Sequence, residues 1–243
     1  ILGESFGPLF PRSRDQVIPL VTSVNIAAEC TRGDPCVMHR TVAAAAAAGT
    51  SIGAHPGYPD LQASAAATWR FPPMKPLIRA VSNLALAGFC KAEGTALAHV
   101  KPHGQLYNRA AKDAALAEAI AAAVPFDPTL VLVGLAGGKL IEAGRAANLA
   151  TAQEFFADRN YMADGTLVPR KQERRDRRRG LRRSARGARG SGSTIEAVDG
   201  STIEVAADTI CIHGDNAHAL EFAKKIRTAL AQADVELKPC RAQ

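Results

Sequence analysis

The sequence predicts an α/β fold in which parallel strands alternate with helices around a barrel. Short β-branched and apolar runs alternate at least five times with longer, Ala-rich helical stretches along the 243 residues, and this order implies parallel pairing through right-handed crossovers. Polar, glycine-containing loops follow several successive strands. Both a barrel and an open sheet fit the alternation, but an open sheet gathers its ligand residues near one switch point, so the spread over several loops favours a closed ring.

The expected elements follow one another along a single barrel domain spanning 1–243. β-branched and apolar residues predict strands with the sequences IPLVTSV (18–24), TSIGA (50–54), ALAHV (96–100), LVLV (130–133), TAQEF (151–155), DTICI (208–212) and VEL (235–237). Ala-rich stretches predict helices at 35–48, 75–93, 110–124, 139–148 and 217–233.

The charge of the chain is concentrated in one segment. Residues are 47% hydrophobic and 22% charged, which excludes disordered and fibrous classes. The net charge of +7 suggests a polyanionic partner, but residues 170–189 hold eleven basic and two acidic residues, so a local +9 leaves −2 on the remainder. The 171–193 segment is almost free of apolar residues, so we interpret it as an anomalous Arg-rich insert. Because it lacks aromatic residues, only nonspecific, salt-sensitive nucleic-acid binding is expected, and no specific nucleic-acid partner.

Cysteine usage and hydropathy predict a cytoplasmic protein without membrane contact. The five cysteines are scattered and form no C-x-x-C pair, which indicates reduced thiols rather than a disulfide framework or a structural zinc site. No apolar run approaches the roughly 18 residues of a membrane span, and no signal segment opens the chain. Because the chain starts at Ile1 without an initiator Met, we expect an N-terminal piece to be missing.

His99, Lys101 and His103 alternate at the end of a predicted strand. A period of two places these side chains on one face, where they can ligate a metal, bind a carboxylate or transfer protons. The alternative is a satisfied core histidine at 99 and a solvent-exposed lysine at 101. Function is favoured, because three ionisable groups facing a barrel interior are costly without a ligand.

Other polar groups follow the neighbouring strands. His55 and Asp60 bracket a rigid Pro-Gly-Tyr-Pro turn, which suits the placement of an acid and a base. Asp158, Arg159 and Tyr161 form a dense polar loop, with a surface loop containing an Asp–Arg pair as the alternative. His213 and Asp215 follow the carboxyl end of another predicted strand, and Tyr107 lies in the same loop as His103. The Gly134–Gly138 turn leads into a helix and can hold an anion on its backbone N–H groups. The alternative is a plain tight turn, because the sequence lacks the spacing of a phosphate loop.

These loops carry a family resemblance. The runs IGAHPGYPDLQ, AHVKPHGQLYN, VLVGLAG, EFFADRNYMADGTLVPR and DTICIHGDN, with LGESFG and LVTSVNIA nearer the start, resemble the LamB/YcsF family. The resemblance implies an irregular (β/α) barrel of the glycoside hydrolase/deacetylase type with about seven parallel strands. It also implies a hydrolase that acts as the A subunit of ATP-dependent 5-oxoprolinase, which opens the 5-oxo-L-proline lactam to L-glutamate with partner B and C subunits.

Under this reading the site residues take chemical roles. Asp60, Lys101 and His103 are the expected catalytic residues: His103 and Asp60 transfer protons, and Lys101 binds an anion together with Arg159. The remaining candidates are expected to bind substrate or ATP: His55, His99, Tyr107, Asp158, Tyr161, His213 and Asp215. Four of them, His55, His99, His213 and Asp215, are also candidates for shaping the site or holding a divalent metal such as Mg. The alternative activity is that of a metal-dependent amide or carbohydrate deacetylase, which the same barrel type supports.

Three stretches depart from the family pattern. The chain starts at the end of the family's first strand, which carries an Asp-x-Asn-x-Asp pattern, and Ile1 stands where an Asp would be. Thr31 stands in a histidine position, and Ala63–Ala66 replace Gly-Phe-Gly-Arg. Permitted codons for 28–32, 63–71 and the segment from 171 onward, read one base out of frame, restore family-like residues. We therefore hypothesise compensating single-base frame errors in these stretches, which resequencing of the DNA tests.

Overall fold

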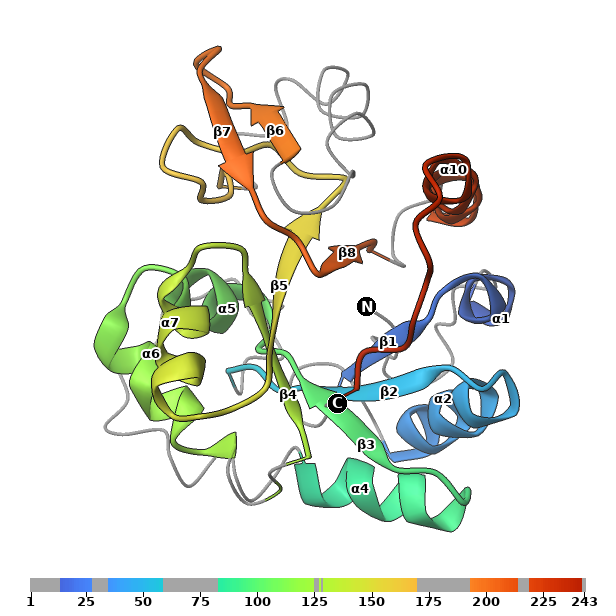
Figure 1. Cartoon of the computed structure of the whole chain (residues 1–243). Helices are drawn as coiled ribbons and strands as arrows, with labels where there is room; N and C mark the ends of the chain where they lie inside the picture. The colour runs from blue at the N-terminus through green and yellow to red at the C-terminus, as the bar shows by residue number, and fades with distance from the viewer. Residues whose placement is uncertain are drawn as a thin grey trace.

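The computed structural model describes residues 14–27, 35–58, 83–124, 127, 129–169, 193–213 and 219–241 (Figure 1). The stretches to which we assign frame errors, 28–32, 63–71 and 171–193, lie outside these residues, except for Ser193. Asp60 and Asp215 also lie outside them, as does the segment 75–82 of one expected helix.

A curled half-barrel of six parallel strands forms the centre of the molecule (Figure 1). The strands are β1 (Ser23–Ala27), β2 (Ser51–His55), β3 (Leu97–Val100), β4 (Val131–Leu135), β5 (Thr151–Phe156) and β8 (Thr209–Cys211), in that spatial order. Every neighbouring pair is parallel. The predicted α/β fold with parallel strands is confirmed.

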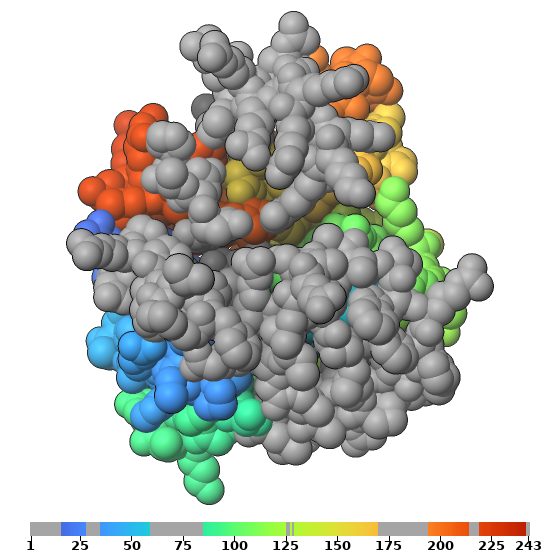
Figure 2. All heavy atoms as spheres, turned by 180° about the vertical axis from the view of Figure 1, so that it is seen from behind, coloured from blue at the N-terminus to red at the C-terminus, as the bar shows by residue number. Residues whose placement is uncertain are grey.

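Helices flank this sheet along its length. They are α1 (Arg14–Val17), η1 (Ile18–Leu20), α2 (Pro35–Ala47), α4 (Asn83–Ala92), α5 (Gly104–Ala110), α6 (Ala114–Ala121), α7 (Lys139–Ala146) and α10 (Ala219–Gln232). α2 contacts β1 and β2 and packs on α4, and the two helices lie side by side when the molecule is seen from behind (Figure 2). α7 contacts β4 and β5. None of the described helices is long and apolar enough to span a bilayer.

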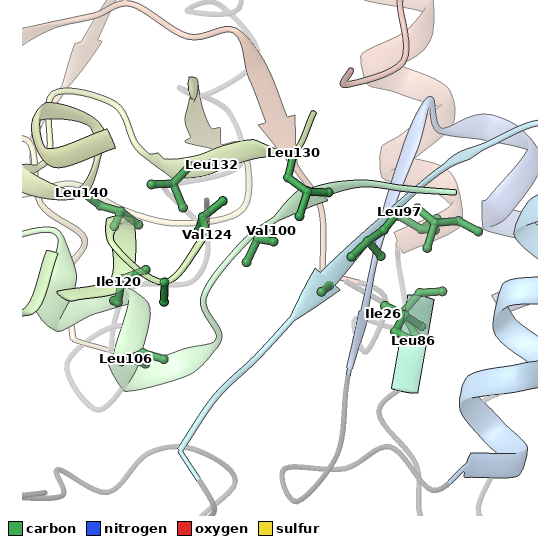
Figure 3. Packing of buried hydrophobic residues seen from close by; sticks show 14 of the residues in the cluster. Ile26, Leu86, Leu97, Val100, Leu106, Ile120, Val124, Leu130, Leu132 and Leu140 are labelled. Carbon is green, nitrogen blue, oxygen red and sulfur yellow. The ribbon is translucent and has the colours of Figure 1, made fainter. Parts of the chain in front are cut away.

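The main hydrophobic core lies between the sheet and these helices (Figure 3). Ile26 of β1, Val100 of β3 and Leu132 of β4 point outward into it and meet Leu86 of α4 and Leu140 of α7. Because side chains alternate along a strand, their neighbours Asn25, His99, Lys101 and Val131 face the interior of the half-barrel.

That interior holds a cavity of about 740 Å³. Its lining includes the polar residues Asn25, His99, Glu154 and Cys211, and also Val131, Val133 and Ala152, which form a separate apolar cluster. The C-terminal segment packs against this cluster through Cys240. The Cys240 N–H donates to Ser23 Oγ at 3.0 Å, and its carbonyl accepts from Ser51 Oγ at 3.0 Å.

Several predicted boundaries are wrong for identifiable reasons. Pro19 lies at the start of η1, so β1 begins only at Ser23 and continues to Ala27 instead of spanning 18–24. Residues 235–237 form no strand: they line the cavity as irregular chain. The expected helix at 110–124 is shorter in the structure, because α5 ends at Ala110 and α6 spans only Ala114–Ala121. The Asp113 carboxylate accepts from the Leu116 N–H and so fixes the start of α6.

The antiparallel hairpin of β6 (Ser193–Glu196) and β7 (Thr202–Val205) is an addition to the predicted elements. Its signal is present in the sequence, because Asp199-Gly200 separates two alternating runs and Gly200 adopts a φ of 89°. Ile195 and Val205 pack in a second cluster with Phe155 and Tyr161, which places the hairpin above the carboxyl end of β5 (Figure 1).

Candidate functional site

A buried polar cluster lies where β3, β5 and β8 end. Lys101 directly follows β3, and its Nζ donates to Glu154 Oε1 at 2.5 Å and to Cys211 Sγ at 3.2 Å. Tyr107 donates its hydroxyl to Glu154 Oε2 at 2.9 Å. The Lys101 and Glu154 side chains are only 1% and 3% exposed, so this ion pair is almost completely removed from water. The Lys101 Nζ also lies 4.8 Å from the centroid of the Phe156 ring.

The protonation states in this cluster follow from burial and pairing. Desolvation opposes the charge on Lys101, but the neighbouring Cys211 and Glu154 outweigh it and hold the lysine pKa above its ordinary value. Burial raises the pKa of the Cys211 thiol to about 12, and burial with the Glu154 charge raises the pKa of Tyr107. At neutral pH the cluster therefore contains a charged ion pair, a neutral thiol and a neutral phenol.

His55, at the end of β2, is a neutral imidazole with a defined tautomer. Its Nδ1 lies 2.7 Å from the Lys101 carbonyl oxygen, and since a carbonyl only accepts, Nδ1 carries the proton. Burial, then the charges of His103 and Lys101, hold the pKa of His55 well below its ordinary value. Its Nε2 is consequently an acceptor, and it is buried without a hydrogen-bond partner within the described ranges. The His103 ring lies edge-on to His55, with centroids 4.6 Å apart.

His99 is the second buried imidazole of the interior. Its Nε2 lies 3.0 Å from Asn25 Oδ1 on β1, and its ring crosses Gly53 of β2 on the way. Burial, with the Lys101 charge, lowers the pKa of His99 to about 3. Its Nδ1 also has no hydrogen-bond partner among the residues that the structure describes.

Asp158 and His213 form a pair after β5 and β8. The Asp158 Oδ2 lies 2.7 Å from His213 Nδ1, and both side chains are about one-tenth exposed. Desolvation opposes the charge on Asp158, but its hydrogen bond and charge interaction with His213 lower the carboxyl pKa. His213 stacks on Phe156 at 5.6 Å between centroids. Phe156 therefore connects this pair to the Lys101 ammonium.

Arg159 and Tyr161 shape the loop that follows β5. Arg159 donates from Nη2 to the Val168 carbonyl at 2.6 Å, and the Tyr161 hydroxyl accepts from the Phe156 N–H at 2.8 Å. Tyr161 also pairs with Leu167 in a short antiparallel bridge. These contacts bring the two ends of the loop together.

The structure thus gathers most of the sequence-predicted residues around the carboxyl ends of the strands. Lys101, Tyr107 and His55 share direct contacts, with His103 against His55, while His99 lies deeper in the interior. Asp60 and Asp215 belong to the undescribed part of the chain. The Gly134–Gly138 segment is a plain tight turn, because two of its N–H groups already have protein partners. The Gly137 N–H donates to Gln153 Oε1, and the Gly138 N–H donates to the Leu135 carbonyl.

Sequence reasoning missed Asn25, Gly53, Glu154 and Cys211. Glu154 left a signal: it is an acid within the otherwise apolar end of TAQEFF, at a position of the same parity as Ala152 and Phe156. The other three left no comparable signal, because their importance depends on contacts across the sheet.

The described residues do not form a metal centre. No three His, Cys, Asp or Glu side chains within them are grouped to hold a metal ion, although the acceptors His55 Nε2, His99 Nδ1 and Asp158 Oδ1 are buried and unsatisfied there. These acceptors match hydrogen-bond donors of a ligand.

Comparison with known proteins places the chain among close relatives. A model of the LamB/YcsF family matches residues 2–243. The 5-oxoprolinase A subunit of Tolumonas auensis is 49% identical, with 98% of this chain and 96% of the relative covered. Its counterpart in Geobacillus kaustophilus is 46% identical, with 98% and 94% covered, and that in Bacillus subtilis 45%, with 97% and 93% covered. The crystal structure of the lactam utilization protein from Thermus thermophilus aligns with a TM-score of 0.85 at 39% identity, covering 98% of this chain and 96% of that one.

Proposed function

The chain belongs to the LamB/YcsF family, and on that premise we propose that it is the A subunit of an ATP-dependent 5-oxoprolinase, which converts 5-oxo-L-proline to L-glutamate. The observation that carries the proposal is nearly full-length identity of 49% to a protein of that name. The 39% identical lactam utilization protein supports the same substrate class. The name of the relatives implies partner subunits, and we assign the B and C subunits of 5-oxoprolinase to this role.

The reaction requires an amide carbonyl to be made more electrophilic. ATP supplies this when its γ-phosphoryl group is transferred to the lactam oxygen, which releases ADP. Water then adds to the ring carbon and the C–N bond breaks, which leaves an acyl phosphate on the opened chain. A second water hydrolyses this acyl phosphate to phosphate and the side-chain carboxylate of glutamate. The nitrogen takes up a proton as the ring opens. We assign the ATP to the assembled complex.

The interior of this chain suits the hydrolytic half of that sequence. Its unsatisfied acceptors, His55 Nε2 and His99 Nδ1, match the donors of a lactam N–H or an attacking water. His103, at the mouth beside His55, is our candidate for proton transfer together with Asp60. Lys101 supplies a fixed positive charge at the carboxyl end of β3, although its ammonium is already paired with Glu154. Its contribution is therefore to the electrostatics of the site rather than to binding a full anionic charge alone.

Glutamate release tests this proposal. The purified chain is combined with candidate B and C subunits, 5-oxoproline and ATP, and glutamate is measured with each component omitted in turn. Activity that needs the chain, both partners and ATP is expected. Glutamate formation that is indifferent to the chain would refute the proposal.

Two substitutions with matched controls test the site within the same assay. We expect His103→Ala to lower kcat by at least about 100-fold, the usual range for a proton-transfer group. Lys101→Met should lower kcat by about 100-fold or more as well, because it removes a fixed charge from the site. His39→Ala and Lys139→Ala are the controls, because these side chains are half exposed on α2 and α7. Full activity of both site variants would remove these residues from the mechanism.

We also propose a cytoplasmic location. Its support is the state of the cysteines, because Cys36, Cys90, Cys211 and Cys240 are all free thiols. Fractionation of the native cells with an antibody to the chain tests the location, and recovery in an extracytoplasmic fraction would contradict it.

A further inference from the structure

Asn25, Gly53 and His99 form a row across three neighbouring strands. Asn25 of β1 is in register with Gly53 of β2, and Gly53 is in register with His99 of β3. Adjacent strands lie about 4.8 Å apart, so the side chains of β1 and β3 are separated by roughly two such spacings. The 3.0 Å contact between His99 Nε2 and Asn25 Oδ1 nevertheless connects them.

Gly53 makes this contact possible. A Cβ at position 53 would lie 2.0 Å from His99 Nε2 and 2.2 Å from its Cδ2, well inside the van der Waals limit. Gly53 shows no positive φ in the strand, so its backbone conformation does not require glycine. The requirement at position 53 is therefore the absence of a side chain, because the His99 imidazole lies directly over the Gly53 backbone.

The hydrogen bond to Asn25 also fixes where His99 carries its proton. The amide oxygen only accepts, so Nε2 donates and carries the hydrogen. A fully buried imidazole beside the Lys101 charge stays neutral, and the pKa of about 3 agrees with this. Nδ1 is then a lone pair, buried without a partner among described residues, on a side chain that lines the cavity.

We infer that Asn25 and Gly53 are positioning residues that hold His99 as the Nε2–H tautomer, so that its Nδ1 accepts a hydrogen bond from the substrate N–H or the water that occupies the barrel interior. An unsatisfied buried acceptor is costly, and a ligand with a donor group removes that cost. An anionic group at this position would instead face a lone pair. The activity part of this inference rests on the proposed function, whereas the tautomer is a property of the free chain.

The tautomer is measured directly by two-bond ¹H–¹⁵N correlation spectra of the ¹⁵N-histidine-labelled chain. The chain has six histidines, and the His99 signals are identified by their loss in His99→Asn. We expect an Nε2–H pattern for His99 in the wild type. Asn25→Asp keeps an oxygen acceptor and retains the pattern, whereas Asn25→Leu removes the acceptor and gives a substantial Nδ1–H population.

Activity in the reconstituted complex is the second readout. Removing a hydrogen-bond partner that orients a metal-bound histidine costs about 10- to 100-fold. By analogy, we expect Asn25→Leu to lower kcat by a similar factor and Asn25→Asp to recover part of it. Gly53→Ala should lower activity through the displaced ring. Its control is Gly88→Ala on α4, where an added Cβ meets nothing within 4 Å. Should Gly53→Ala fail to fold in thermal unfolding, the Asn25 pair still decides the matter.

Three results would each overturn the inference: an Nδ1–H tautomer in the wild type, an unchanged tautomer in Asn25→Leu, or full activity of that variant. A wild-type complex without activity on 5-oxoproline instead refutes the proposed function. The spectra then decide alone whether Asn25 holds the ring.

Discussion

Replacing Glu154 by glutamine separates a buried charge from its partner. Glutamine preserves the shape of the side chain but removes the negative charge 2.5 Å from Lys101 Nζ, at a site where both side chains are at most 3% exposed. Removing one partner of a buried ion pair destabilises a protein by about 3–5 kcal/mol. A chain of 243 residues unfolds with an entropy of about 0.5 kcal/mol/K, so the expected fall in Tm is about 6–10 °C.

Thermal unfolding measures this effect, and a matched pair calibrates it. Glu142 pairs with Lys139 at 2.7 Å on the surface of α7, with exposures of 59% and 46%, so Glu142→Gln should lower stability by under about 0.5 kcal/mol. Lys101→Met combined with Glu154→Gln should be less destabilised than the sum of the single variants, because no unpaired charge remains. Equal effects of the two glutamine variants, or strict additivity in the double variant, would refute this reasoning.

The penalty should also depend on pH. In the wild type the pKa of Lys101 is raised above its ordinary 10.5, so its stabilising contribution is present at neutral pH and is lost as the pH rises through that raised value. The difference between wild type and Glu154→Gln should therefore shrink in alkaline solution. Two further changes test neighbouring parts of the fold. The lowered carboxyl pKa of Asp158 stabilises the fold above the ordinary aspartate value of about 3.9, so Asp158→Asn should cost stability at neutral pH but progressively less below about pH 4; a pH-independent difference in acid unfolding would argue against this. Gly144→Ala would place a Cβ 2.7 Å from Thr151 Cγ2 and should lower the free energy of unfolding by about 1–2 kcal/mol in urea titration, because overpacking outweighs the helix propensity of alanine; an unchanged or higher stability contradicts the tight packing.

The parallel strands, and the alternation of strands with helices, were predictable because the buried strands are short and largely apolar runs. LVLV at 130–133 is such a run, and β4 occupies Val131–Leu135. The failures occurred where local sequence competes with tertiary contacts. VEL at 235–237 has the alternation of a strand, but these residues line the cavity as irregular chain and pair with no strand in the described ranges.

The site was predictable only as far as strand ends identify it. Lys101 and His55 follow from the rule that parallel strands present their carboxyl ends on one face. The partner of Lys101, Glu154, lies 53 residues away, and nothing local links the two. Gly53 reads in sequence as an ordinary strand glycine, and its role appears only with the His99 ring lying over it.

The contact of Cys240 with Ser23 and Ser51 has a consequence for how the chain reaches this state. These hydrogen bonds join residues 217 and 189 positions apart, so this part of the half-barrel cannot form until the chain through Cys240 has left the ribosome. Until then Val131, Val133 and Ala152 are not covered by the C-terminal segment. Contacts between residues so far apart in sequence slow folding. During synthesis the apolar surface at the amino-terminal ends of the strands therefore stays exposed, and we expect chaperone binding or aggregation to begin there.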